Sequence, residues 1–264
     1  MTIRSAGADE FALAQTSVHR CAAMGRGIRD PADVSSTGVH EVGAIDVFAG
    51  LSAPQLEDCA RGASRRHLAK GQLVFHQGGK PARFHALLSG WVRILQTGPD
   101  GGLSIIRFVG PGEIFGAFAL FAEQGYPADA TAAVDARELS WSESQLRELI
   151  ERYPRIAMNL VGVAARRLSE LQERFREVST QCAEQRVANA LLRISRTRDS
   201  IRNQTPVEIP LPLTRKDVAA LSATTLHTAS RVMAAWERRG ILISAGRLMS
   251  IVLPTELARI GEGQ

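Results

Sequence analysis

The most constraining feature of this sequence is a heptad repeat that starts after Pro154. Apolar or small side chains recur at alternating steps of four and three residues, namely Ala157, Val161, Ala164, Leu168, Leu171, Phe175, Val178 and Cys182. Arginine and glutamate flank this seam, which is typical of a helix that pairs with a second copy in a coiled coil. At about 1.5 Å per residue, such a helix spans roughly 40 Å. The pattern favours a homodimer, and a long helix packed on its own domain is the alternative.

In residues 68–139, short apolar segments alternate with glycine. The segments cover residues 73–75, 84–88, 91–95 and 103–109. Strands of this length at roughly 8–12-residue spacing predict an antiparallel roll or barrel. The run 98–102, Gly-Pro-Asp-Gly-Gly, predicts a turn, since proline presets φ and glycine accepts positive φ.

The last third of the chain carries an ordered set of short elements. Thr214 is placed to cap a helix that runs to Leu221, and a turn at 222–224 leads into a second helix over 225–239. A hairpin then follows over 241–253, with its turn at Ala245 and Gly246. Each piece alone is most simply part of a hydrophobic core. In this order, they predict a winged helix-turn-helix that binds DNA.

The charge distribution supports a polyanionic partner for the same region. From Cys182 to the end, the chain has 12 basic and 7 acidic residues, whereas the first 181 residues have 20 of each. The whole net charge of +5 therefore lies in the last third. A basic surplus of this kind is expected where nucleic acid docks, although solvated basic faces are also common.

Several classes of protein are disfavoured by what the sequence lacks. Cys21, Cys59 and Cys182 are far apart and form no CxxC pair, so free thiols are expected rather than disulfides, a zinc site or an iron–sulfur cluster. No phosphate-binding glycine loop, nucleophile elbow or paired metal-ligand motif occurs, so an enzyme is not expected. No apolar run approaches the ~20 residues of a membrane span, and no secretion signal is evident. We therefore expect a cytoplasmic protein without a membrane partner.

Several motifs resemble the CRP/FNR family of transcription regulators, over roughly residues 44–260. "GQLVFHQGGKPARFHALLSGWVRI" and "GPGEIFG" resemble its β-roll, and "TRKDVA" with the "SR" of "TTLHTASR" resembles its DNA-binding helices. The resemblance implies an α+β chain with a cyclic-nucleotide-binding-type β-roll, a dimerisation helix and a winged helix-turn-helix. The expected parts are a flexible arm (1–40), the sensor β-roll (41–150), the dimerisation helix (151–182) and the DNA-binding domain (183–264). The implied partners are double-stranded DNA with a two-fold-symmetric operator, a second copy of the chain and, for an activator, RNA polymerase.

The resemblance also assigns DNA-contacting residues. It places Thr225, Leu226, His227, Ser230 and Arg231 on the recognition helix, where the arginine fork suits guanine O6 and N7. The residues assigned to the DNA backbone are Thr214, Arg215 and Lys216. His227 departs from the family, since most relatives carry a glutamate there, so the usual operator half-site is not expected.

The resemblance places an effector pocket at Gly116, Ala117, Phe118, Asp129 and Thr131. Cyclic-AMP-responsive relatives carry Gly-Glu for the ribose hydroxyl and Arg-Ser for the cyclic phosphate. Here Ala117 replaces the glutamate, which removes a sugar acceptor, and Asp129 lies in the segment that matches Arg-Ser, where it would repel a phosphate. Cyclic nucleotides are therefore disfavoured. The segment "ALFAEQGYPADATAAVDA" resembles the nitric-oxide-responsive, denitrification-linked branch. That branch makes haem a candidate cofactor, with ligands to be sought among His19, His67, His76 and His85. The alternative is a regulator without an effector, or one controlled by oxidation of a thiol such as Cys182.

Overall fold

The computed structural model describes residues 38–99, 101–121, 125–195 and 206–264. Residues 38–264 form one compact unit. His19, Cys21 and most of the expected N-terminal arm lie outside the described residues. The arm was expected to extend to residue 40, but residues 38–43 are helical and Val42 is fully buried, so the folded part begins earlier.

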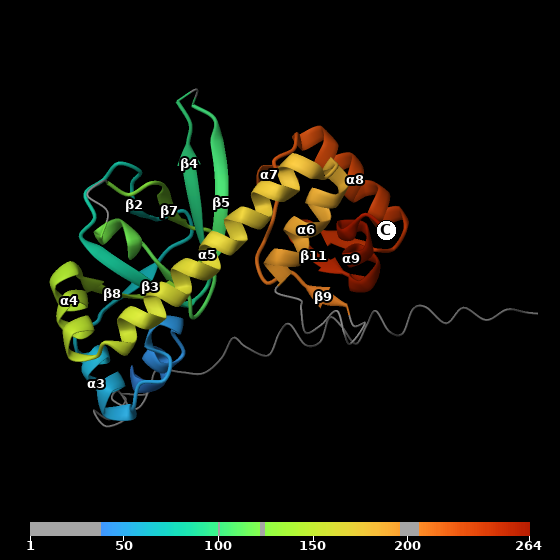
Figure 1. The fold of residues 1–264 in the computed structure, drawn as a ribbon. Helices are drawn as coiled ribbons and strands as arrows, with labels where there is room; N and C mark the ends of the chain where they lie inside the picture. The colour runs from blue at the N-terminus through green and yellow to red at the C-terminus, as the bar shows by residue number, and fades with distance from the viewer. Residues whose placement is uncertain (1–37, 100, 122–124, 196–205) are drawn as a thin grey trace, which may run out of the picture. The chain divides into compact units, whose positions relative to one another are not determined.

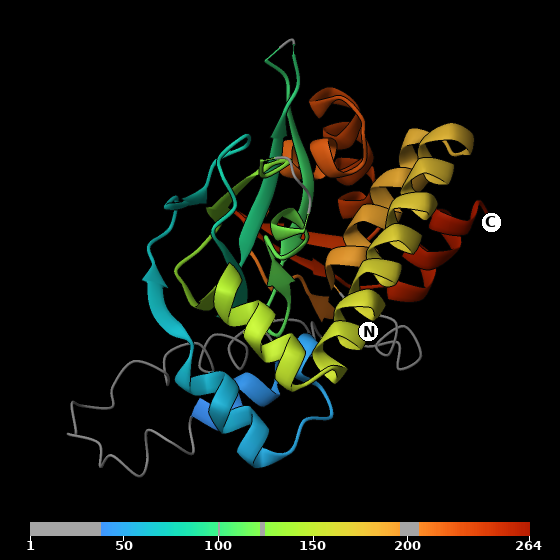
Figure 2. The ribbon, with the colours of Figure 1, turned by 60° about the vertical axis from the view of Figure 1, so that its left-hand side comes forward.

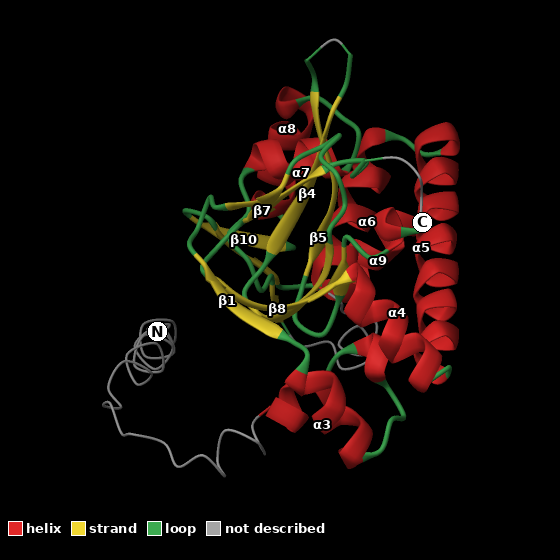
Figure 3. Ribbon diagram, turned by 90° about the vertical axis from the view of Figure 1, so that its left-hand side faces the viewer, coloured by secondary structure: helices red, strands yellow, loops and turns green. Residues whose placement is uncertain are grey.

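Two antiparallel four-stranded sheets form the β-roll expected from the glycine-punctuated segments (Figures 1 and 3). The first sheet has the order β1-β8-β3-β6, with bounds Ser64–Leu68, Ala136–Ser142, Arg83–Ser89 and Ile114–Phe115. The second has the order β2-β7-β4-β5, with bounds Leu73–Phe75, Asp129–Ala132, Val92–Thr97 and Leu103–Val109. Side chains from both sheets meet in one apolar cluster that includes Leu68, Leu87, Val92, Val109 and Phe115.

The outer face of the first sheet is covered by short helices, named α3 (Ala53–Arg61) and α4 (Glu143–Arg152). Both begin with the serine-to-glutamine capping boxes that their sequences contain, at Ser52 and at Ser142. Trp141 of β8 is fully buried below them and stacks on Phe84 with ring centroids 4.7 Å apart. This second core also includes residues of the single turns η1 (Asp46–Phe48) and, from the loop after β6, η2 (Phe118–Leu120).

The heptad repeat forms one continuous helix, α5 (Arg155–Thr180), shown in yellow in Figures 1 and 2. Its bounds correct the expected dimerisation helix of 151–182 at both ends. Residues 151–152 complete α4, Pro154 precedes the first turn of α5, and Gln181 is extended with φ −105° and ψ 148°. Cys182, the last member of the expected seam, therefore lies outside the helix.

The C-terminal region forms its own core around the remaining elements. These elements are α6 (Ala183–Ser195), β9 (Val207–Glu208), α7 (Arg215–Leu221), α8 (Leu226–Arg238), β10 (Leu242–Ala245), β11 (Leu248–Ile251) and α9 (Pro254–Glu262). The hairpin of β10 and β11 is extended by β9 into a three-stranded sheet, which is the wing expected from the sequence. Trp236 and Met233 of α8 lie fully buried in this core.

None of the helices in the described residues combines the length and the apolar character that crossing a membrane would need. The longest, α5, carries arginine and glutamate among its apolar residues from Arg166 onward.

Candidate nucleic-acid interface and effector pocket

The two helices of the helix-turn-helix begin at side-chain caps. The Thr214 hydroxyl accepts a hydrogen bond from the backbone N–H of Asp217 at 3.1 Å, and the Asp217 carboxylate accepts from the N–H of Thr214 at 2.8 Å. Thr225 caps α8 in the same way, since its hydroxyl accepts from the N–H of Thr228 at 3.1 Å. Capping boxes of this kind satisfy amide groups that the first turn leaves unpaired. Thr214 and Thr225 thus have structural roles beside any contact with DNA.

One face of α8 is buried and the other is exposed, which leaves a reading face for a ligand. Ala229, Val232, Met233 and Trp236 pack inward. Leu226 is 51% exposed, and His227 and Arg231 are exposed as well, while Ser230 is half-buried. Among the described residues, no hydrogen bond or ion pair engages the side chain of His227 or Arg231. The helix therefore presents an imidazole and a guanidinium with their hydrogen-bonding groups available.

Arg215 differs from the other residues expected to contact the DNA backbone. Its Nη1 donates to the carbonyl of Ser230 at 3.0 Å, and its Nη2 lies 2.9 Å from a carboxylate oxygen of Glu237. Both partners belong to α8, so this guanidinium links the first helix of the motif to the second. Lys216, by contrast, is exposed at the start of α7. Of this pair, Lys216 is exposed to solvent, and Arg215 links α7 to α8.

Arginines on other elements also contact α7. Arg93 of β4 lies 3.4 Å from the carboxylate of Asp217 in α7. Arg174 of α5 contacts both β5 and α7, and its shorter hydrogen bond goes to the carbonyl of Ile106 in β5. A second, longer contact joins Arg174 to the carbonyl of Leu221, at 3.5 Å. Burial lowers the pKa of the Arg174 guanidinium from its ordinary value, and the nearby positive charge of Arg193 lowers it further.

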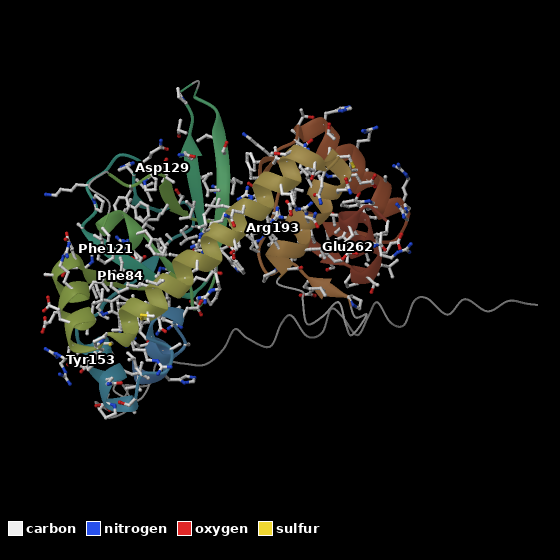
Figure 4. All side chains as sticks on the ribbon, viewed as in Figure 1. Phe84, Phe121, Asp129, Tyr153, Arg193 and Glu262 are labelled. Carbon is white, nitrogen blue, oxygen red and sulfur yellow. The ribbon has the colours of Figure 1, made fainter. Side chains whose placement is uncertain are left out.

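A buried ion pair joins α5 to α6 just before the DNA-binding helices. Both oxygens of Glu177 accept from Nη1 of Arg193, at 2.5 and 2.7 Å (Arg193 is labelled in Figure 4). Glu177 is only 4% exposed. In the sequence, Glu177 is one of the charged residues that flank the heptad repeat, and its pairing with Arg193 was not predicted. The signal was weak, because the partner is 16 residues away on a helix whose packing the sequence does not specify.

The expected effector pocket is crowded by aromatic rings of the chain itself. Gly116 has φ +75°, and a Cβ added there would lie 3.2 Å from Phe75 and 3.3 Å from Tyr126. Those two rings stack with centroids 3.8 Å apart, and the Tyr126 hydroxyl donates to the carbonyl of Arg83 at 2.9 Å. Ala117 is fully buried close to them. Little space remains between these rings and the glycine.

The other expected pocket residues do not converge on that space. The Asp129 carboxylate accepts a hydrogen bond from the backbone N–H of Gln77 at 2.6 Å, which ties β7 to the turn after β2 (Asp129 is labelled in Figure 4). Phe118 is 44% exposed, and Thr131 pairs in register with Arg93 and Leu73 of the neighbouring strands. Because its carboxylate already accepts from the backbone and carries negative charge, Asp129 is unsuited to hold a phosphate.

The histidine candidates differ sharply in burial. His67 and His76 are exposed, whereas His85 is 4% exposed on β3. Nδ1 of His85 lies 3.3 Å from Oε2 of Glu138, which is 1% exposed, and the other oxygen of Glu138 accepts from Arg66 at 2.8 Å. The facing atoms of His85 and Glu138 are at ion-pair distance but are not aligned as a hydrogen bond. A carboxylate behind an imidazole is also the arrangement that orients metal-ligating histidines.

Haem does not fit beside His85 in this arrangement. The imidazole stacks on Phe115 with centroids 5.0 Å apart and has Phe75 at 5.7 Å on another side. A Cβ on Gly116 would already lie 3.4 Å from the ring. A porphyrin would require several of these side chains to move. The described residues also contain no group of three or more histidine, cysteine or acidic side chains placed to hold a metal ion.

The two described cysteines have opposite environments. Cys59 on α3 is fully buried, and burial raises the pKa of its thiol to about 12. Cys182 is exposed between α5 and α6. Since the thiolate is the reactive form, Cys59 is expected to be inert and Cys182 is the accessible thiol.

Comparison with known proteins assigns a family to this arrangement. The model of the cyclic nucleotide-binding domain matches residues 65–153, which contain most of the β-roll, and the model of the Crp-like helix-turn-helix domain matches residues 185–260. The two matches fall on either side of α5. Together they account for the sensor-like and DNA-binding parts in the order seen in the structure.

Individual relatives agree with these matches. The cyclic AMP receptor protein of Thermus thermophilus is 31% identical over 74% of this chain and 87% of its own length. The nitrogen fixation regulation protein FixK of Bradyrhizobium diazoefficiens is 26% identical over 74% of this chain and 81% of its own. The structure of FixK2 from Bradyrhizobium japonicum superposes with a TM-score of 0.65, at 23% identity over 75% of this chain and 96% of that one. This chain belongs to the CRP/FNR family of DNA-binding transcription regulators.

Proposed function

We propose that the protein is a homodimeric regulator that reads DNA with α8 and responds to nitric oxide or redox state rather than to a cyclic nucleotide. The observation that carries the DNA-reading part is the exposed face of α8. Its His227 and Arg231 have no intramolecular partner among the described residues, while the opposite face holds the helix in the core. An arginine of this kind suits a bidentate contact with guanine, and an imidazole can donate or accept at a base edge.

The proposed dimer is supported by an apolar stripe along α5. Phe175 is 76% exposed, and four more apolar residues on the same side are more than half exposed, namely Val161, Leu168, Leu171 and Val178. A contiguous stripe of this size is rare on a monomer and indicates an interface. Its steps of three and four residues match the seam of a parallel pair of helices, so a second copy of the same helix is the proposed partner.

The proposed signal is supported by what the β-roll offers a ligand. Stacked Phe75 and Tyr126 occupy the space beside Gly116, and Asp129 adds a negative charge where a nucleotide phosphate would need a positive one. These features disfavour a cyclic nucleotide. The segment that resembles the nitric-oxide-responsive branch leads to nitric oxide as the candidate signal. Haem bound by His85 is disfavoured, because Phe75 and Phe115 occupy the space around that imidazole.

The DNA-binding part is tested by selecting duplexes from a random pool with the purified protein. We expect recovery of a sequence with two inverted half-sites about one helical turn apart. Recovery of unrelated sequences, with affinities no higher than those for the unselected pool, would contradict the proposal. An absorption spectrum of the same protein, purified from cells supplied with haem, tests the cofactor, since a Soret band would show haem bound at a histidine other than His85.

The signal is tested by measuring the affinity for the selected duplex with and without a nitric oxide donor. We expect the donor to change this affinity. No change would remove nitric oxide as the signal and leave the alternative, a regulator without an effector or one controlled by oxidation of a thiol such as Cys182. The exposed Cys182 favours a thiol route, because nitrosylation is a reversible modification of accessible thiols. A response that disappears in Cys182→Ser, but persists in Cys59→Ser, would assign it to that route.

A further inference from the structure

The turn between α7 and α8 has an uncommon backbone conformation. Ala223 has φ +48°, in the left-handed region that residues other than glycine rarely adopt. The carbonyls of Ser222 and Ala223 lie at the C-terminal end of α7, where helix carbonyls lack partners within the helix. A turn of this kind persists only when surrounding groups hold it.

A single guanidinium holds both of these carbonyls. Arg186 of α6 donates from Nε to the carbonyl of Ser222 at 3.0 Å and from Nη2 to that of Ala223 at 3.1 Å. Its remaining nitrogen, Nη1, donates to the carbonyl of Gln181 at 2.9 Å. Gln181 directly follows the last residue of α5. The rigid fork of one side chain therefore connects the end of the long helix with the turn that sets the start of α8.

The end of α5 is itself anchored to the C-terminal core. The side-chain amide of Gln181 donates to the carbonyl of Gly261 in α9 at 3.3 Å, and its oxygen accepts from Asn189 at 3.0 Å. Asn189 packs so closely on Gly261 that a Cβ there would lie 2.4 Å from its Oδ1. The Glu177–Arg193 ion pair holds α6 on α5 one turn before that end. Arg186 extends this chain of contacts to the DNA-reading helix.

We propose that Arg186 is a positioning residue that sets the spacing between the two DNA half-sites. The inference rests on the proposed dimeric, DNA-reading function. If two copies pair along α5, the angle between α5 and α8 determines how far apart the two recognition helices lie. One base pair of spacing shifts a half-site by about 3.4 Å and rotates it by roughly 34°. A linkage of three hydrogen bonds at this junction makes the dimer selective for one spacing.

The test uses the half-site recovered by selection, placed as inverted pairs in duplexes whose spacer changes one base pair at a time. The full-length protein, Arg186→Ala, Arg186→Lys and Arg259→Ala are compared. We expect the unaltered protein to prefer one spacer over its neighbours by about tenfold. Arg186→Ala is expected to reduce this ratio to about threefold or less. Arg186→Lys should behave similarly, because one ammonium cannot reproduce a planar fork.

Arg259→Ala is the matched control. It removes the same charge from the same region, but Arg259 is exposed, and its ion-pair partner among the described residues is Glu256, three residues away. We expect it to keep the spacing ratio. A general loss of stability or of active protein lowers binding to all spacers together, so the ratio isolates the positioning role.

The outcomes distinguish this inference from the proposed function. An unaltered protein that selects no half-site pair would remove the proposed function and this inference with it. An unaltered protein with a sharp spacing preference that Arg186→Ala retains would overturn the inference alone. Loss of folding in both Arg186 variants would also overturn it, since Arg186 would then be a stability residue.

Discussion

Trp236 of the recognition helix donates its indole N–H to Glu184 of α6, with 3.0 Å between Nε1 and Oε1. The indole is fully buried, whereas Glu184, in the first turn of its helix, is exposed. The buried N–H of Trp236 thus has its acceptor on an exposed residue, so the packing of α8 depends on the Glu184 carboxylate. This hydrogen bond is one contact by which α6 positions α8, the helix proposed to read DNA.

We predict that Glu184→Ala destabilises the C-terminal core by about 1–3 kcal/mol, because it leaves the indole N–H buried without an acceptor. Chemical denaturation followed by tryptophan fluorescence measures the loss. Glu184→Gln keeps an acceptor oxygen and should recover most of the stability. Equal stability of the alanine variant and the unaltered protein would show that water replaces the carboxylate.

Phe175→Glu is expected to convert the dimer to monomers, because it places a charge at the most exposed apolar position of the α5 stripe. Size-exclusion chromatography with light scattering measures the mass directly. Ser169→Glu is the control, since Ser169 lies on the same helix but off the stripe. A dimer that survives Phe175→Glu would place the interface elsewhere.

Arg231→Ala and Lys216→Ala are expected to weaken DNA binding in different ways. Loss of Arg231 should cost about 1–3 kcal/mol at one base position and relax the sequence preference there. Loss of Lys216 should weaken binding to all sequences and reduce the slope of log affinity against log salt by about 0.9. Affinities measured over a salt series for selected and mismatched duplexes separate the two. An unchanged slope for Lys216→Ala would argue against its phosphate contact.

Acid stability is predicted to depend on Asp58. The hydroxyl of Tyr153 donates to this carboxylate at 2.9 Å and Arg152 donates to it as well, which together lower the pKa of Asp58 (Tyr153 is labelled in Figure 4). A carboxylate whose pKa is lower in the folded than in the unfolded protein stabilises the fold at pH values above its unfolded-state pKa of about 3.9. That contribution is lost as the pH falls through the folded-state pKa. Thermal melts against pH should therefore show Asp58→Asn less stable at neutral pH, with the difference vanishing in acid.

Thiol labelling should distinguish the two described cysteines. In a Cys21→Ser background at neutral pH, we expect a maleimide to modify Cys182 rapidly, because its thiol is exposed. Cys59 should react only after unfolding, since burial raises its pKa to about 12 and encloses the sulfur. Mass spectrometry of digested protein locates the label. Labelling of Cys59 in the folded protein would indicate local opening of α3.

The agreement between sequence and structure is best where a signal is local or periodic. The heptad repeat after Pro154 forms the continuous helix α5, and Thr214 caps the start of α7 as expected. These signals need only residues within one or two turns of each other. Helix starts, turn positions and the inward face of α8 could therefore be read before any packing was known.

Tertiary packing decided which polar groups meet. Arg215 was expected at the DNA backbone, yet its guanidinium pairs with Glu237, 22 residues further along. Nothing in the sequence marks the pairing of His85 with Glu138 or the closure of the β-roll interior by Phe75 on Tyr126. Such contacts depend on how sheets and helices that are far apart in the sequence pack together, and they produce no periodic pattern in the sequence.

The heptad repeat and the order of motifs were sufficient to determine the class of the protein, because side-chain periodicity specifies which face of each element is buried. The link from α5 through Arg186 to the turn at Ala223 arises only from the tertiary structure. The physical reason is that a hydrogen bond requires atoms within about 3 Å. Only the packed arrangement of α5, α6 and α7 brings the guanidinium of Arg186 that close to all three carbonyls.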